Sequence, residues 1–139
     1  RPDAEELCRE LNLCDEIRFL GKQQEMEEIL AISDLFVLTS DYESFGLSAL
    51  EAMAAGVPVL STNAGGLPEI NLHGKTGYMA NVGDVKALST LGIELLQNEQ
   101  QLASFKQAAK EHAAQFAIHR IVPLYEELYK RFVPASATA

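Results

Sequence analysis

The sequence predicts an α/β fold built on a parallel, doubly wound β-sheet with helices on both faces. Amphipathic helical segments alternate with short, continuously apolar segments, such as residues 35–38 and 57–60. Apolar runs of this length are typical of strands buried on both faces, and their alternation with helices requires right-handed crossover connections. A chain of 139 residues has room for one core of this kind, so we expect a single domain.

Three helix–strand cycles make up the first half of the chain. The first helix is predicted from its acidic start and the second from apolar residues that recur on one helical face, and each strand is predicted from a short apolar run. Gly21 closes the first strand and Gly56 ends the third helix. The predicted helices are 3–12, 24–32 and 45–55, and the predicted strands are 17–20, 35–38 and 57–61.

A glycine-rich loop, a short helical turn and a fourth strand follow. Residues 63–66 read NAGG, Pro68 begins the helical turn, and the strand is expected at 78–80. In a doubly wound sheet, ligands bind beyond the carboxyl ends of the strands. We therefore expect three loops to converge on one cleft, namely 21–23, 39–44 and 62–68.

The last third of the chain predicts three helices that close the domain. Their apolar residues fall on three separate stripes with helical spacing. These helices should complete one domain over residues 1–133, whereas the tail at 134–139 has nothing to bury and should fray. The stripes are Val85, Leu88, Leu91, Leu95 and Leu96; Leu102, Phe105, Ala109, Ala113 and Phe116; and Ile121, Val122, Tyr125, Leu128, Tyr129 and Phe132.

The charge of the chain excludes several classes of partner. Twenty acidic residues against eleven basic ones give a net charge of −9, which repels nucleic acid and anionic membranes. The apolar runs are far shorter than the roughly 20 residues that span a bilayer, and no charged start precedes an apolar signal core. The sequence thus predicts a cytoplasmic protein.

Cysteine and histidine give no sign of a metal site. Cys8 and Cys14 have no histidine near them, and their spacing fits neither a zinc site nor a disulfide framework, so we interpret them as reduced thiols. His73, His112 and His119 are scattered over a loop, a helix and a helix start. We expect no bound metal and no cofactor.

The segment at 39–53, TSDYESFGLSALEAM, could bind an anion. It runs from a strand end through a polar loop into a helix, for which Ser44 is the predicted N-cap. The unpaired amides of the first turn, with Gly46 allowing a ligand close to the backbone, would suit a pyrophosphate. The alternative is an ordinary capped helix whose end faces solvent.

Two carboxylates flank this helix start. Glu51 lies within an apolar, small-residue helix, where a pair of sugar hydroxyls would satisfy both of its oxygens. Glu43 precedes the helix start, at the mouth of the same cleft. Together they could bracket a ligand whose phosphates rest on the amides between them, unless Glu51 points to solvent on the outer face of the helix.

These residues resemble a known signature. Glu43 and Glu51, eight residues apart, resemble the E-x7-E motif of the family-four retaining glycosyltransferases, which have the GT-B fold. The resemblance covers almost the whole chain and implies a Rossmann-like C-terminal domain that binds a nucleotide sugar. Further matching segments are Arg18-Phe19-Leu20-Gly21, Ala55-Gly56-Val57-Pro58-Val59, Gly65-Gly66-Leu67-Pro68-Glu69 and Gly74-Lys75-Thr76-Gly77-Tyr78.

The resemblance implies a role for each matching residue. Glu43 would contact the donor-sugar hydroxyls at the catalytic centre, and Glu51 the ribose hydroxyls. Gly21 and Lys22 match the loop that lies against the nucleobase. The helix start whose amides hold the sugar and the diphosphate corresponds to Phe45, Gly46, Leu47 and Ser48.

The resemblance also implies what the chain lacks. The N-terminal, acceptor-binding domain of such enzymes is absent, as are the basic residues that bind phosphate earlier in the same domain, so the isolated chain should be inactive. An unpaired sheet edge would favour a homo-oligomer. The reaction expected is metal-independent transfer with retention, without a protein nucleophile.

Two segments resemble one group within this family. Residues 61–63 and 81–85 look most like the enzymes that join N-acetylglucosamine, from a UDP donor, to L-malate. The sucrose, glycogen and cell-wall transferases remain alternatives. Outside the family, the alternative is a non-catalytic α/β module, either an autonomous nucleotide-binding domain or a receiver-like domain with Asp41 beyond a strand end.

Overall fold

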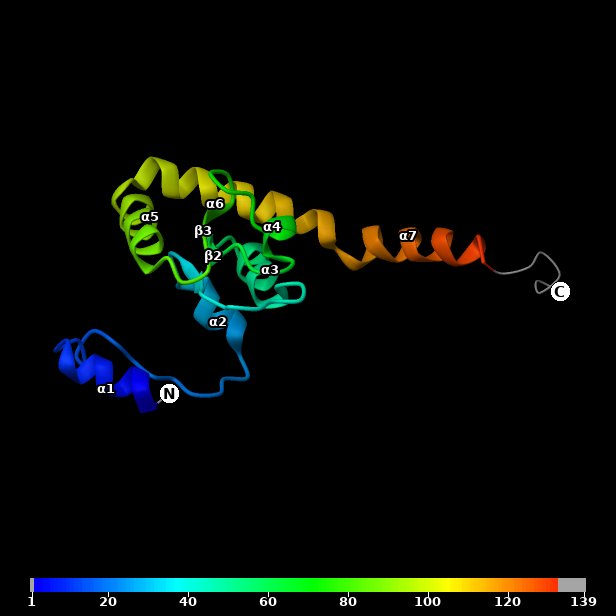
Figure 1. Ribbon diagram of the computed structural model, residues 1–139. Coiled ribbons are helices and arrows are strands. Elements are labelled where there is room, and N and C mark those ends of the chain that lie inside the picture. Colours follow the sequence, from blue (N-terminus) through cyan, green and yellow to red (C-terminus); the bar gives the residue numbers. More distant parts are fainter. Residues whose placement is uncertain (1, 133–139) are drawn as a thin grey trace.

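The computed structural model describes residues 2–132 (Figure 1). Seven α-helices, one 3₁₀ helix and three strands lie in this range. In chain order they are α1 (Pro2–Glu10), α2 (Met26–Ala31), β1 (Phe36–Leu38), α3 (Leu47–Ala54), β2 (Val59–Thr62), α4 (Leu67–Ile70), β3 (Gly77–Ala80), α5 (Val85–Gln97), α6 (Glu99–Ala113), η1 (Ala114–Phe116) and α7 (Ile118–Lys130).

The three strands form one parallel sheet in the order β1-β2-β3. Phe36 pairs with Val59, and Leu60 pairs with Tyr78. All four residues of β2 are buried, because this strand has a neighbour on each side and helices over both faces. The predicted α/β fold with a parallel sheet is confirmed.

Helices cover the two faces of the sheet with separate apolar clusters. On one face, α3 and α4 bury Met53, Leu67 and Ile70 against β2, together with Leu30 of α2. On the other face, α5 covers Leu60 and Tyr78 with an apolar cluster of its own. The long helix α6 contributes to both clusters, and Figure 1 shows it running along one end of the sheet.

A buried polar network joins β2, β3 and the end of α4. The side-chain Nδ2 of Asn71 donates to the backbone carbonyl oxygen of Val59 at 3.0 Å and to that of Tyr78 at 3.1 Å. The Thr76 hydroxyl donates to Asn71 Oδ1 at 3.0 Å. Both side chains are fully buried, and these bonds satisfy polar atoms that would otherwise be costly inside the core.

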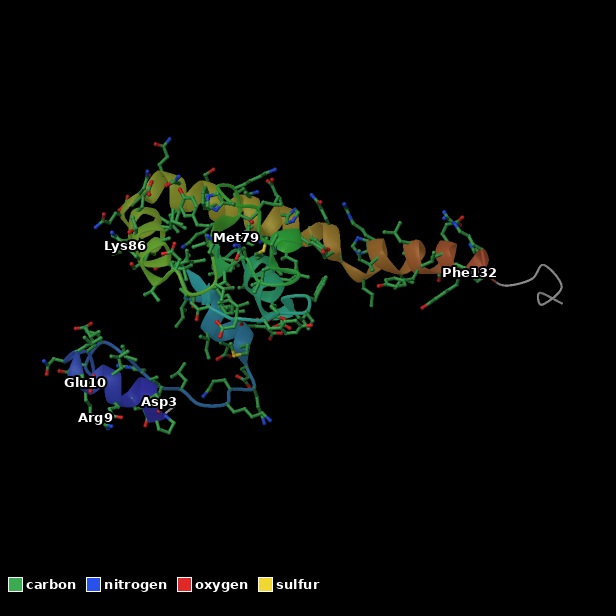
Figure 2. All side chains as sticks on the ribbon, in the orientation of Figure 1. Asp3, Arg9, Glu10, Met79, Lys86 and Phe132 are labelled. Carbon is green, nitrogen blue, oxygen red and sulfur yellow. The ribbon has the colours of Figure 1, made fainter. Side chains whose placement is uncertain are left out.

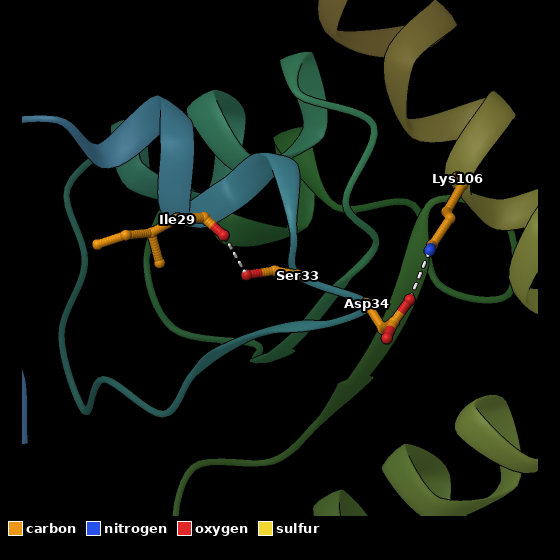
Figure 3. A network of polar contacts seen from close by, with 4 residues as sticks. All are labelled: Ile29, Ser33, Asp34 and Lys106. Carbon is orange, nitrogen blue, oxygen red and sulfur yellow. Dashed lines mark hydrogen bonds and ion pairs between the residues drawn. The ribbon is translucent and has the colours of Figure 1, made fainter. Parts of the chain in front are cut away.

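An ion pair on the surface connects α6 to the start of β1. Lys106 Nζ lies 2.7 Å from Asp34 Oδ1 (Figure 3). The Ser33 hydroxyl beside it donates to the carbonyl oxygen of Ile29 at 2.7 Å, at the end of α2. The turn that leads into β1 is therefore held by one contact to α2 and another to α6.

Two expectations about the ends of the domain are wrong. Residues 17–20 form no strand, because neither edge of the described sheet pairs with them. Helix α7 does not close the core: none of its residues is buried, and it projects away from the sheet, with Phe132 beyond its far end (Figure 2). The predicted frayed tail at 134–139 lies outside the described residues.

Candidate functional site

The loops that follow the three strands meet at the carboxyl edge of the sheet. The Thr62 hydroxyl, at the end of β2, donates to the Ser40 carbonyl oxygen beyond β1 at 2.6 Å. The amide of Asn63 donates to Asn81 Oδ1 beyond β3 at 2.8 Å. Two of the three loops expected to converge, 39–44 and 62–68, therefore do so.

Backbone contact between these two loops depends on two glycines. The Gly66 N–H donates to the Glu43 carbonyl oxygen at 3.1 Å. A Cβ on Gly65 would overlap the same carbonyl, and one on Gly66 would lie 2.6 Å from the Ser44 carbonyl oxygen. The glycine-rich loop is thus required to seat the Glu43 loop against β2.

Glu43 is half-buried at the start of α3. Its Oε1 accepts a hydrogen bond from the Gly46 N–H at 3.2 Å. Gly46, and not the predicted Ser44, is the N-cap, and its left-handed backbone (φ 89°) makes the helix begin at Leu47. The predicted cap is wrong because the chain turns two residues later, where only glycine adopts this conformation readily.

The amides at the start of α3 are available to a ligand. The first intrahelical bond runs from the Leu50 N–H to the Gly46 carbonyl oxygen, so the amides of Leu47, Ser48 and Ala49 have no partner within the helix. The side chains of Leu47 and Ser48 are exposed. Such a helix start favours an anion through its unpaired amides and its dipole.

Phe45 lies just before this helix start and is 45% exposed. Its ring packs edge-on against Phe116 of η1, with a centroid distance of 6.4 Å. Phe116 in turn contacts the His112 ring at 5.4 Å. The loop that carries Glu43 is therefore supported from behind by an aromatic group at the end of α6.

Gly46 is required for a different reason from the one that the sequence suggested. A Cβ added there would point into the core, 2.8 Å from Leu67 Cδ2 and 3.4 Å from Ile70 Cδ1. The absent side chain thus leaves room for α4, not for a phosphate. Replacement of Gly46 should therefore disturb the fold itself, and not only the approach of a ligand to the backbone.

Glu51 is exposed on α3 and lines a groove of about 550 Å³. The burial argument for its role is therefore wrong, since this carboxylate needs no ligand to satisfy it. Its side chain nevertheless points toward a groove, whose opposite side is formed by α2. The other lining residues are Gln24, Met26, Glu27, Leu30, Ala54 and Ala55.

Gly21 and Lys22 are exposed on the segment that leads to this groove. Gly21 has a left-handed backbone (φ 68°), and Gln24, two residues after Lys22, lines the groove. The predicted base-binding loop therefore approaches the Glu51 side of the site, while Glu43 lies at the opposite end of α3.

Sequence reasoning missed two residues of the site. Gln24 lines the same groove as Glu51, and Phe116 packs against Phe45. Neither belongs to a motif, and Phe116 is 71 positions beyond the residue it contacts. No local pattern indicates such contacts, since they arise only from the packing of helices around the sheet.

Within residues 2–132, no group of three or more His, Cys, Asp or Glu side chains could hold a metal ion. In the same range no helix has the length and apolarity to span a bilayer. Burial, helped by the nearby Lys75 charge, lowers the pKa of His112, against a smaller opposing effect of the Ile70 backbone. The His112 ring lies against Phe116, which supports the Phe45 loop, and does not line the groove.

The sequence of the chain matches a known family over most of its length. Residues 3–112 match the model described as glycosyl transferases group 1. The chain is 44% identical over 125 residues to N-acetyl-alpha-D-glucosaminyl L-malate synthase of Bacillus anthracis, covering 89% of this chain and 33% of that protein. It is 36% identical over 129 residues to D-inositol 3-phosphate glycosyltransferase of Corynebacterium urealyticum, covering 91% and 30%.

Solved structures agree with this match. HepE of Anabaena, in complex with UDP and glucose, superposes with a TM-score of 0.83 at 26% identity, covering 94% of this chain and 35% of that one. The C-terminal domain of a group 1 glycosyl transferase from Francisella tularensis superposes with a TM-score of 0.74 at 25% identity, covering 84% and 62%. The chain spans about a third of the length of the curated relatives it matches.

Proposed function

Because the chain belongs to the group 1 glycosyl transferase family, we propose that it forms the nucleotide-sugar-binding wall of a retaining glycosyltransferase. The observation that supports this most is the arrangement around α3. Glu43 and the free amides lie at the start of the helix, and Glu51 lines a groove along it. One extended ligand with a sugar, a diphosphate and a ribose could contact all three.

Each part of the site has a role in this proposal. Both oxygens of Glu51 accept hydrogen bonds from the ribose hydroxyls, and Gly21 and Lys22 lie against the base. Glu43, whose Oε1 already accepts the Gly46 amide, contacts the sugar hydroxyls through its remaining acceptor capacity. Phe45 and Gly46 position the loop.

The amides of Leu47 and Ser48 would act on the leaving group. As the bond between sugar and diphosphate breaks, negative charge develops on the phosphate oxygens, and fixed donors stabilise it in the transition state. The acceptor attacks from the face that the diphosphate leaves, which retains the anomeric configuration. We assign no protein nucleophile and no metal to this reaction.

For the substrates, we propose UDP-N-acetylglucosamine as donor and L-malate as acceptor. The supporting observation is the 44% identity to the synthase of Bacillus anthracis, whose name specifies this sugar and this acceptor. The hydrogen bond between Asn63 and Asn81 also joins the two segments that carried this resemblance in the sequence. The match to glycosyl transferases over residues 3–112 favours this function over a receiver-like module.

The isolated chain should bind its donor weakly and transfer no sugar. It provides one wall of the cleft, and its net charge of −9 opposes a diphosphate. We expect a Kd in the millimolar range, about −4 kcal/mol of binding free energy. Transfer needs the acceptor-binding partner domain, so sugar transfer by the purified 139-residue chain would contradict this account.

A titration with several nucleotides tests the proposal. The chain should bind UDP and UDP-N-acetylglucosamine more tightly than ADP-glucose or GDP-mannose, and acetyl phosphate should have no effect. Nuclear magnetic resonance can measure binding at this strength and shows which amides shift. Shifts confined to residues outside the α3 start and the Glu51 groove would refute the site.

Replacement of Glu51 tests the most specific contact. In the full-length parent enzyme, Glu51→Ala leaves two ribose hydroxyls unpaired, so we expect a loss of about 2–3 kcal/mol, or roughly 30- to 150-fold in affinity for the donor. Glu51→Gln should recover part of the binding. Glu94→Ala, which removes an exposed carboxylate from α5, is the matched control. A loss below twofold for Glu51→Ala would exclude the proposed contact.

A further inference from the structure

The two cysteines of the chain face each other at the N-terminal end of the molecule. Cys8 Sγ lies 3.4 Å from Cys14 Sγ. They are the only cysteines among the 139 residues. Their spacing alone did not suggest a pair, so this contact is a finding of the structure.

The backbone holds this pair together. Cys8 lies near the end of α1, and the Leu13 N–H returns to the Cys8 carbonyl oxygen at 2.9 Å. Asn12 takes a left-handed conformation (φ 54°), which reverses the chain between the two cysteines. The Ile17 N–H then donates to the Leu13 carbonyl oxygen at 3.0 Å, so the turn is fixed on both sides of Cys14.

We propose that Cys8 and Cys14 form a reversible disulfide within the chain when the protein meets a small disulfide oxidant. A disulfide bond is about 2.05 Å long, so the sulfurs must approach by a little over 1 Å, roughly the reach of side-chain rotation. The backbone turn described above need not open for this.

The two thiols differ in access, which sets the order of the reaction. Cys14 is exposed, whereas Cys8 is only 4% exposed. Both line a hollow of about 240 Å³, to which Arg9, Ile17 and Phe19 also contribute. A small disulfide can enter there beside the Arg9 cation, and Cys14 is the sulfur that it reaches first.

The exchange proceeds in two balanced steps. The Cys14 thiolate attacks one sulfur of the oxidant, forming a mixed disulfide and releasing the first small thiolate. The Cys8 thiolate then attacks Cys14 Sγ, forms the Cys8–Cys14 bond and expels the second thiolate. Two electrons pass from the cysteines to the oxidant, and the two protons end on the released thiols. Burial and the neighbouring Cys14 raise the pKa of Cys8, which agrees with its role as the second thiol to react.

The bond would stiffen the turn that leads into the segment with Gly21 and Lys22. Without it, this turn is held by its backbone hydrogen bonds and by the packing around Cys8, whereas Leu11, Leu13 and Leu20 are exposed. In the oxidised chain, the turn could not open without breaking a covalent bond. The proposal does not depend on the donor-binding function.

Peptide mapping tests the bond directly. The chain is equilibrated in buffers with different ratios of oxidised to reduced glutathione, trapped with an alkylating reagent and digested with trypsin. Cleavage after Arg9 and Arg18 puts the two cysteines in separate peptides, 1–9 and 10–18. We expect these peptides to be joined in the oxidised chain, with the intact mass lower by two hydrogen atoms, and to separate on reduction.

Two variants test the order of attack. In Cys8→Ser, Cys14 should stop at the mixed disulfide with glutathione. In Cys14→Ser, the buried Cys8 should remain a thiol under the same conditions. Three results for the wild-type chain would overturn the proposal: accumulation of the mixed disulfide, a disulfide between two chains, or two free thiols under all conditions.

These three results are measured on the wild-type chain, so the proposal can be tested even if a variant does not fold.

Discussion

Two regions with similar sequence patterns have very different environments. In the body, from α2 to η1, the apolar residues of the helices pack on the sheet and bury two clusters. Two arms, residues 2–25 and 118–132, extend away from the body (Figure 1). Most of their large apolar side chains remain exposed: Leu11 is 57% exposed and Tyr129 61%. Periodicity therefore predicts a helix in both regions, whereas burial also requires a surface to pack against.

The segment at 17–20 shows that a strand, too, needs a partner surface in addition to an apolar sequence. Its apolar residues Ile17, Phe19 and Leu20 are 39–55% exposed, and they pair with no described strand. A strand needs a neighbour for its backbone hydrogen bonds, and a sequence pattern alone does not supply one. Burial of this segment and of α7 should follow if the surfaces they pack against lie in the rest of a longer protein.

The largest expected effect on the free energy of unfolding comes from a variant that disrupts close backbone packing in the body. A Cβ on Gly77 would overlap the Val59 carbonyl group, so Gly77→Ala should separate β3 from β2 and cost more than about 4 kcal/mol. Gly74→Ala, in the same turn, meets nothing within 4 Å but has a left-handed backbone (φ 77°), so about 1–2 kcal/mol is expected. Urea denaturation compares the two, and similar stabilities would contradict the packing argument.

A pair of leucines tests the contrast between body and arm. Leu95 of α5 is fully buried, whereas Leu128 of α7 is 44% exposed. Leu95→Ala should lower the free energy of unfolding by about 2–5 kcal/mol, because it leaves a cavity. Leu128→Ala should change it by less than about 0.5 kcal/mol. A large effect of Leu128→Ala would show that α7 packs in solution, by self-association if the effect depends on protein concentration.

The sequence predicted most of the body because its local signals agree. Gly56 ends α3 as expected, with a left-handed backbone (φ 82°), and Asp84 and Asn98 cap α5 and α6. The short apolar runs became β1 and β2 with shifts of one or two residues. These features depend on neighbours in the chain, so they can be read without the tertiary structure.

The candidate site was predictable in its residues but less so in its geometry. The sequence placed Glu43 before the start of α3 and Glu51 within the helix, as the structure has them. It also put the cap at Ser44 instead of Gly46, and its argument for Glu51 treated this carboxylate as buried, with a solvent-facing position as the alternative. Both errors concern atoms whose environment is set elsewhere: Gly46 by contact with Leu67, and Glu51 by the position of α2. Local sequence carries no signal for either contact.

Acid should weaken the body through His112. Its Nε2 atom is buried with no hydrogen-bond partner among the described residues, and its pKa is lowered. The unfolded chain then binds the proton more tightly, so stability should fall as the pH drops below about 6.5, the usual pKa of histidine.

The pH dependence of stability between pH 7 and 5 measures this effect. His112→Leu removes both the titrating ring and the unsatisfied Nε2 atom, so it should flatten the profile in that range. His119→Gln, on the exposed arm, controls for the loss of an imidazole elsewhere in the chain. An unchanged profile in His112→Leu would mean that other groups cause the acid dependence.

The smallest expected effect belongs to a contact that lies within the body but stays in water. The side chains of Lys106 and Asp34 form the ion pair between α6 and β1 at 37% and 67% exposure. Solvent screens such a pair, and holding two mobile side chains in one geometry offsets part of the attraction. A double-mutant cycle of Lys106→Met and Asp34→Asn should give a coupling of about 0.2–1 kcal/mol at low salt, smaller at high salt. Lys110→Met, an exposed lysine on the same helix, controls for the loss of charge. A coupling energy well above this range would mean that a contact in the body can be strong even when its side chains stay exposed to water.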